Sequence, residues 1–265
     1  MAFLSDITLG AYFPGSSFIH RLDPRTKFIA MLILLTGVVS SLDFIHLFAY
    51  LLLFIAAVLG SRLPFGLLLR NLKPFLWLFV LTVVFHLFFT SGESAFRVPG
   101  VGLSVSGRGA VTGAVYSIRL ALLILYAALF TLTTSPIEMT DALEKLLAPL
   151  RRIRLPVHEI VMMLTLSLRF VPTLIEEAQR LMNAQRSRGA SFTGGPLRRA
   201  RSVVPLIVPL FVSAFRRADD LALAMDARCY SGGQGRTAYK RLSYNRSDIC
   251  LLCFCVAVLI PSLFA

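Results

Sequence analysis

The sequence is short of charge, and of acidic charge above all. Only 15% of its 265 residues are charged, against about 25% in an average soluble domain, while 56% are hydrophobic. Asp and Glu together number 14 and Lys and Arg number 27, which leaves a formal net charge of +13. A water-soluble chain of this length does not need so much apolar surface. We therefore expect an integral membrane protein in the lipid bilayer.

Motifs for catalysis, ATP binding and metal binding are also missing. The chain has no phosphate-binding loop with its lysine, no Gly-x-Ser-x-Gly and no His-Glu-x-x-His. Its four cysteines fall in the last 37 residues, three of them in an apolar run, which argues against a disulfide framework or a zinc ribbon. His46 and His86 have no ligand-spaced neighbours. We expect no catalytic residue, no metal site and no cofactor, so energy for any transport must come from another subunit.

Stretches without charge locate five expected membrane spans. Residues 28–61 contain only Asp43 and His46 as ionisable groups, and a polar break at 40–43 favours a hairpin of two short spans over one long tilted helix. A loop with short strand-like pieces is expected at 91–109. The other three spans are expected at 74–90, 110–135 and 249–265.

Basic residues suggest the domain organisation. Residues 136–247 hold 18 of the 27 basic residues and two apolar runs, 155–168 and 202–215, that are too short for a span and favour packed or interfacial helices. The short loops rich in Lys and Arg place the N-terminus and this region in the cytoplasm. We thus expect three parts: an N-terminal amphipathic segment with spans one to four at 1–135, a cytoplasmic helical domain at 136–247 and a last span at 248–265.

Arg119 is the one basic residue well inside an expected span. A charge within the membrane is a functional candidate. Small residues before it allow the span to begin later, and we favour an Arg119 that lies near the outer interface and extends its side chain toward water.

A loose internal repeat ends twice in an arginine between small residues. Each segment is about 30–35 residues, enough for a helix of roughly 50 Å. Small neighbours leave the guanidinium free to enter a narrow acidic groove and bond a carboxylate bidentately. The alternative is that each arginine only complements its helix dipole. Spacing alone leaves both interpretations open for the two triplets, Ser187-Arg188-Gly189 and Ala227-Arg228-Cys229.

Several stretches resemble the transmembrane (T) component of energy-coupling factor transporters. They are residues 15–27, 133–144, 168–172 and the two arginine triplets, and the resemblance covers essentially the whole chain. It implies an all-α membrane protein: about five transmembrane helices plus long crossed cytoplasmic coupling helices, in an L shape. It also implies two ABC-type ATPase subunits and a substrate-binding S component as partners, with no ATP site in this chain.

The resemblance also implies which residues couple to the ATPases. The family's small-Arg-Gly motifs each insert one arginine into a groove on an ATPase. By matching position these are Arg188 and Arg228. Ser187 stands where the family usually has Ala, a mild change. Cys229 stands where it usually has Gly, which leaves the backbone geometry after Arg228 open while the docking of Arg228 is still expected. Residues 235–237, Gly-Arg-Thr, fit the family as well.

Residues 155–168 carry an adaptable methionine-bearing surface. We expect it to contact the S component, and packing against the chain's own spans is the alternative. The candidate contact residues are Met162, Met163, Leu164 and Leu166.

The function expected is that of the coupling subunit of an ATP-driven importer for vitamins or micronutrients, in a bacterial or archaeal cell membrane. The equivalent subunit of a dedicated cobalt or nickel importer is the alternative. A membrane enzyme acting on lipid or isoprenoid substrates is disfavoured, because the nearest acidic pairs, 176–177 and 219–220, are flanked by arginines that would neutralise them. No nucleic-acid partner is expected.

Overall fold

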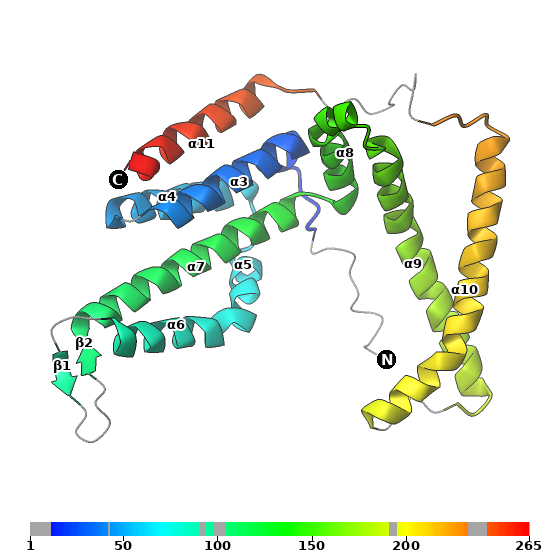
Figure 1. Ribbon diagram of the computed structural model, residues 1–265, viewed down its shortest axis with the longest axis horizontal. Coiled ribbons are helices and arrows are strands. Elements are labelled where there is room, and N and C mark those ends of the chain that lie inside the picture. Colours follow the sequence, from blue (N-terminus) through cyan, green and yellow to red (C-terminus); the bar gives the residue numbers. More distant parts are fainter. Residues whose placement is uncertain are drawn as a thin grey trace. The chain divides into compact units, whose positions relative to one another are not determined.

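The computed structural model describes residues 12–41, 43–90, 94–97, 104–190, 195–232 and 243–264 (Figure 1). Residues 1–11, where the amphipathic segment is expected to begin, and the Gly-Arg-Thr motif at 235–237 lie outside them. The chain divides into two compact units, which we treat separately. The bundle unit contains the described residues from 12 to 135 and from 243 to 264. The long-helix unit contains those from 136 to 232.

The bundle unit begins with the short helix α2 (Phe18–Arg21), followed by α3 (Pro24–Ser40) and α4 (Phe44–Ser61). Asp23 caps α3 by accepting a hydrogen bond from the Arg25 amide, and Pro24 occupies the first helical position, where no amide is needed. Because α3 ends at Ser40 and α4 begins at Phe44, the structure confirms the break in the expected hairpin. Gly37 lets the two helices approach, since a Cβ there would lie 2.0 Å from the Tyr50 hydroxyl.

The chain continues through α5 (Phe65–Leu72), the 3₁₀ turn η1 (Lys73–Phe75) and α6 (Leu76–Phe89). Strands β1 (Ser94–Arg97) and β2 (Ser104–Ser106) then pair antiparallel, which confirms the strand-like pieces expected in this loop. Helix α7 (Gly107–Thr133) packs along α6 through two glycines four residues apart. A Cβ at Gly109 would lie 2.3 Å from the His86 carbonyl oxygen, so the close approach requires glycine.

The last helix, α11 (Arg246–Phe264), packs against α3. Hydrogen bonds join the centre of the bundle: the Tyr126 hydroxyl donates to the Tyr50 carbonyl (2.7 Å), and the Tyr50 hydroxyl pairs with the Ser262 hydroxyl (3.0 Å). Large apolar side chains such as Ile45 and Trp77 remain exposed on the bundle unit. This pattern, with apolar side chains outside and the Tyr50, Tyr126 and Ser262 hydroxyls paired inside, fits a bilayer as the surrounding solvent.

The long-helix unit contains α8 (Pro136–Leu146), the 3₁₀ segment η2 (Ala148–Ile153), α9 (Val157–Ser187) and α10 (Pro196–Asp226). Helices α9 and α10 have 31 residues each, about 46 Å, which confirms the expected long helices. Helix α9 packs on α8, where its Val157 and Val161 are buried. His158 Nδ1 also lies 2.9 Å from Glu144 Oε1 of α8, which adds a polar contact to this packing.

Five helical segments of the described chain are long and apolar enough to cross a membrane. The number equals the five spans expected, but the set differs: α3 is absent because it has only 17 residues, and α9 is included because its apolar run continues beyond residue 168. Length and composition therefore do not separate α9 from the spans. The five segments are Phe44–Ser61, Phe65–Phe89, Gly107–Thr133, Val157–Ser187 and Arg246–Phe264.

Candidate functional site

The first arginine triplet lies at the C-terminal end of α9. After the helix ends at Ser187, the Gly189 amide donates to the Arg186 carbonyl (2.9 Å) and the Ala190 amide donates to the Gln185 carbonyl (2.9 Å). Gly189 has a φ of +88°, in the left-handed region. This pair of bonds around a left-handed residue is a Schellman motif, and it satisfies carbonyls at the helix end.

The second triplet forms the same motif at the end of α10. The Cys229 amide donates to the Asp226 carbonyl (2.9 Å), and the Tyr230 amide donates to the Met225 carbonyl (3.1 Å). Cys229 has a φ of 54°, so it adopts the left-handed conformation of Gly189. The backbone after Arg228, which the replacement of the family's Gly by Cys229 left open, therefore keeps the left-handed conformation. A non-glycine residue is strained there by about 1–2 kcal/mol, which the two hydrogen bonds offset.

Both arginines are exposed, as are their neighbours Ser187, Gly189, Ala227 and Cys229. Within the described part of the chain, neither guanidinium has a hydrogen-bonding or ion-pair partner. The C-caps are made by the residues that follow the arginines, so the side chains of Arg188 and Arg228 are not used to close the helix ends. Each guanidinium is available to donate to a carboxylate of another molecule.

Helices α9 and α10 cross and contact each other (Figure 1). Glu177 Oε2 of α9 lies 2.5 Å from an Arg217 guanidinium nitrogen of α10, and the two residues are 40 positions apart. Arg188 and Arg228 are also 40 positions apart. Each arginine thus follows the contact by 11 residues, about 16 Å of helix. The ion pair places the two arginines at equal distances along their helices from the crossing.

The segment at residues 15–27, which carries much of the resemblance, forms a buried polar cluster in the bundle unit. Asp23, 7% exposed, accepts from the Arg25 guanidinium (2.9 Å), and this hydrogen bond raises the Arg25 pKa. Lys27 Nζ donates to the carbonyls of His20 and Thr133, both at 3.0 Å. Asp248 of α11 accepts from the Asp23 amide (3.0 Å). The cluster ties α3 to the C-terminal end of α7 and the N-terminal end of α11.

Asp248 is the residue of this cluster that the sequence did not single out. It is 2% exposed and also accepts from the Asn245 amide at 2.8 Å. The available signal was an acidic residue immediately before an apolar run, which fits an N-terminal helix cap. Its contact with residue 23, 225 positions away, is visible only in the structure.

The chain is similar to known membrane transport proteins over most of its length. The family described as Cobalt transport protein (CbiQ) matches residues 15–239. The energy-coupling factor transporter transmembrane protein EcfT of Acidaminococcus fermentans is 48% identical over 249 residues, 92% of this chain and 91% of the relative. EcfT of Heliobacterium modesticaldum is 49% identical over 249 residues, and EcfT of Bacillus subtilis is 45% identical over 248 residues; both alignments cover 92% of each chain.

This chain belongs to the family described as Cobalt transport protein (CbiQ). It is a T component of an energy-coupling factor transporter, as the resemblance implied. The relatives' names describe a membrane subunit of a transporter rather than an enzyme, and the apolar helices agree with an all-α, multi-pass membrane protein.

The methionine-bearing surface of this T component lies on α9. Met163 and Leu164 are exposed, at 57% and 42%, whereas Met162 and Leu166 are half-buried. Ile160, one helical turn earlier, is also exposed at 40%. Ile160, Met163 and Leu164 therefore form a short exposed apolar stripe on the helix, while other faces of the same stretch pack within the unit.

A longer exposed apolar stripe lies along α10. Its members recur at intervals of three and four residues, so they lie on one face of the helix. The signal in the sequence is the apolar run at 202–215, whose exposed face only the structure identifies. The members are Val204, Ile207, Val208, Phe211, Val212 and Phe215, all more than 40% exposed.

Arg119 of the T component contacts two residues of the bundle unit. Its guanidinium donates to the Ser41 carbonyl just beyond the C-terminal end of α3, and it lies 5.0 Å from the centre of the Tyr116 ring. A cation at a helix C-terminus complements the partial negative charge there. Arg119 is half-buried. The expectation that its side chain extends toward water is therefore corrected: it binds the end of a neighbouring helix.

Proposed function

We propose that this T component is the coupling subunit of an ATP-driven importer for vitamins or micronutrients. In this proposal Arg188 and Arg228 each dock into an acidic groove on one of two ABC-type ATPase subunits. The ATPases supply the motion, and α9 and α10 transmit it to a membrane-embedded S component that binds the substrate. The observation that carries the proposal is the pair of matching helix ends, each presenting one arginine that has no partner among the described residues.

The number and form of the two motifs support a pair of similar partners. Two Schellman motifs with the same hydrogen bonds present the two arginines in the same local conformation. Such a pair of motifs would recognise two copies of one groove or two related grooves. The excess of basic over acidic residues favours acidic partners as well. The sequence has no phosphate-binding loop of its own, so ATP hydrolysis is assigned to the partners.

The exposed apolar stripes of α9 and α10 are assigned to the S component. Exposed contiguous apolar surface is typical of contact with another protein or with lipid. We place residues 136–247 in the cytoplasm together with the N-terminus, because the short loops on this side of the expected spans are rich in Lys and Arg. Helix α9 belongs there because its second half carries Glu176, Glu177 and Arg180.

The test is alanine substitution of the two arginines in the assembled transporter. Loss of one side of a buried charge pair at an interface costs about 2–5 kcal/mol, so Arg188→Ala or Arg228→Ala should weaken ATPase binding by roughly 30-fold or more. The double variant should abolish ATP-driven uptake into proteoliposomes. Arg180→Ala is the matched control, because Arg180 is exposed on the same helix and pairs only weakly with Glu176 (3.8 Å). Normal uptake by the double variant contradicts the proposal.

Transport of cobalt or nickel is the second candidate, because the matching family is described by cobalt transport. Among the described residues, no group of three or more His, Cys, Asp or Glu side chains is placed to hold a metal ion. In either case the cargo is assigned to the S component. The small membrane protein that co-purifies with this chain in mild detergent decides between them: a metal-binding one favours the second candidate, and a vitamin-binding one favours the first.

A further inference from the structure

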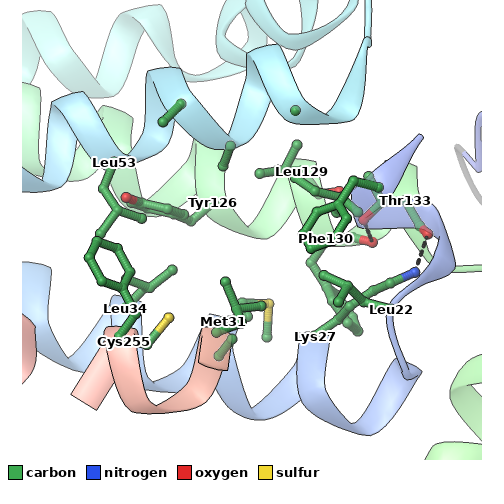
Figure 2. Close-up of a pocket in the computed structure, with 18 residues that line it drawn as sticks. Leu22, Lys27, Met31, Leu34, Leu53, Tyr126, Leu129, Phe130, Thr133 and Cys255 are labelled. Carbon is green, nitrogen blue, oxygen red and sulfur yellow. Dashed lines mark hydrogen bonds between the residues drawn. The ribbon is translucent and has the colours of Figure 1, made fainter. Parts of the chain in front are cut away.

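The bundle unit contains an apolar cavity of about 270 Å³ (Figure 2). Side chains of α2, α3, α4, α7 and α11 line it. On α3 the lining extends from Lys27 to Leu34 and on α7 from Tyr126 to Thr133, two helical turns or about 10 Å in each case. Figure 2 shows Leu34 and Cys255 at one end of the cavity and Lys27 and Thr133 at the other. The cavity is therefore elongated along the helices.

The polar side chains that line the cavity already have partners within the chain. Lys27 Nζ donates to two carbonyls, the Tyr126 hydroxyl donates to the Tyr50 carbonyl, and the Thr133 hydroxyl donates to the Leu129 carbonyl (2.8 Å). A polar ligand would lose its hydrogen bonds to water on entering and find few in return. An apolar occupant loses nothing, and it regains the dispersion contacts that an empty cavity forfeits. The lining chemistry therefore selects a hydrocarbon.

The surroundings of the bundle unit supply such a hydrocarbon. Two of the lining residues, Phe18 and Phe254, are 59% and 54% exposed, so the cavity reaches the outer surface between α2 and α11. Because the bundle is a membrane-spanning part with an apolar exterior, the molecules at this opening are lipid acyl chains. Because the cavity is two helical turns long, it can hold part of one acyl chain lying along the helices.

The polar end of the cavity is positively charged. Exposed Arg21 and Arg62 lie two residues from the lining residues Ile19 and Gly60, which face each other across α2 and α4. The two acidic groups at this end, Asp23 and Asp248, are matched in number by Arg25 and Lys27 of the same polar cluster, so the charges of Arg21 and Arg62 remain in excess. We propose that the cavity binds one acyl chain of an anionic phospholipid whose headgroup contacts Arg21 and Arg62. This proposal is independent of how the ATPases bind.

Lipid retention tests the proposal on the full-length chain. The chain is reconstituted in equal amounts of phosphatidylglycerol and phosphatidylcholine, extracted in mild detergent and weighed by native mass spectrometry. We expect one retained phospholipid. At about 1 kcal/mol per basic residue near the headgroup, two arginines give roughly a 30-fold preference for phosphatidylglycerol. Ala57→Phe, which fills the cavity from α4, should remove the lipid, while Ala49→Phe on the exposed face of the same helix should keep it.

A second pair of variants leaves the packing unchanged. Arg21→Gln with Arg62→Gln should reduce the preference for phosphatidylglycerol to within a few-fold of equality, whereas Arg70→Gln, an exposed arginine on α5, should leave it intact. Retention of the lipid by Ala57→Phe as strongly as by Ala49→Phe overturns the proposal. So does an unchanged preference in the double Arg variant. In the assembled transporter, a crosslinker placed at position 254 should react with lipid. Its reaction with a protein subunit instead also overturns the proposal.

Discussion

In the proposed docking of Arg188 and Arg228, reversing one charge at the crossing of α9 and α10 should weaken the binding of both ATPases at once. Glu177 and Arg217 form the ion pair at this crossing, 11 residues before Arg188 and Arg228 respectively. Two linked contacts bind more tightly than either alone only if the geometry lets both engage together. Glu177→Arg brings two guanidinium groups together, so the helices must separate and the spacing of the two docking arginines changes.

The size of the effect follows from burial. The side chains of Arg217 and Glu177 are 35% and 21% exposed, so the pair lies between an exposed salt bridge, worth about 0.2–1 kcal/mol, and a buried pair, whose breakage costs about 3–5 kcal/mol. We expect a coupling energy of about 1–2 kcal/mol, within the range for residues in direct contact. Each single reversal should then weaken ATPase affinity by roughly 5- to 30-fold.

The assay is a double-mutant cycle on the affinity of the purified chain for the ATPase pair. Glu177→Arg and Arg217→Glu should each lower the affinity, and the combination of both, which restores an ion pair of opposite orientation, should recover most of it. Glu176→Arg is the control, because Glu176 is adjacent but 67% exposed and 3.8 Å from Arg180; it should change the affinity less than about two-fold. A control as harmful as Glu177→Arg, or a double reversal with no recovery, refutes the reasoning.

Two further predictions concern stability. Gly189→Ala should destabilise the end of α9 by about 1 kcal/mol because residue 189 has a left-handed φ. Cys229→Gly should leave the end of α10 unchanged or slightly more stable. Hydrogen exchange of the amides at positions 190 and 230 measures the two effects. Asp248→Ala should leave the buried Asp23 amide without its acceptor, at about 1–3 kcal/mol, and remove the bond from the exposed Asn245 amide at smaller cost, so it should lower the thermal midpoint in detergent. Asp43→Ala, an exposed acidic residue, should not, and equal midpoints for the two variants would contradict this account of Asp248.

Much of the secondary structure could be predicted from local patterns. The break between α3 and α4, the strand-like pieces before α7 and the length of α9 and α10 all follow from where apolar runs stop and where turn-forming residues begin. The two arginine triplets were visible for the same reason, because a helix end and its neighbours are a local property. The membership of α3 and α9 among the candidate spans could not be predicted, since it depends on helix boundaries within a few residues.

The sequence by itself determined that this is a largely helical membrane protein with a basic region and two arginines set between small residues, because partition between lipid and water and the ends of helices depend on neighbouring residues. Only the tertiary structure decided that Glu177 meets Arg217, that Arg119 binds the Ser41 carbonyl, and that Asp248 joins the cluster around Asp23. These pairings join residues from 40 to 225 positions apart. Their energies come from contacts between distant parts of the chain, which no local pattern records.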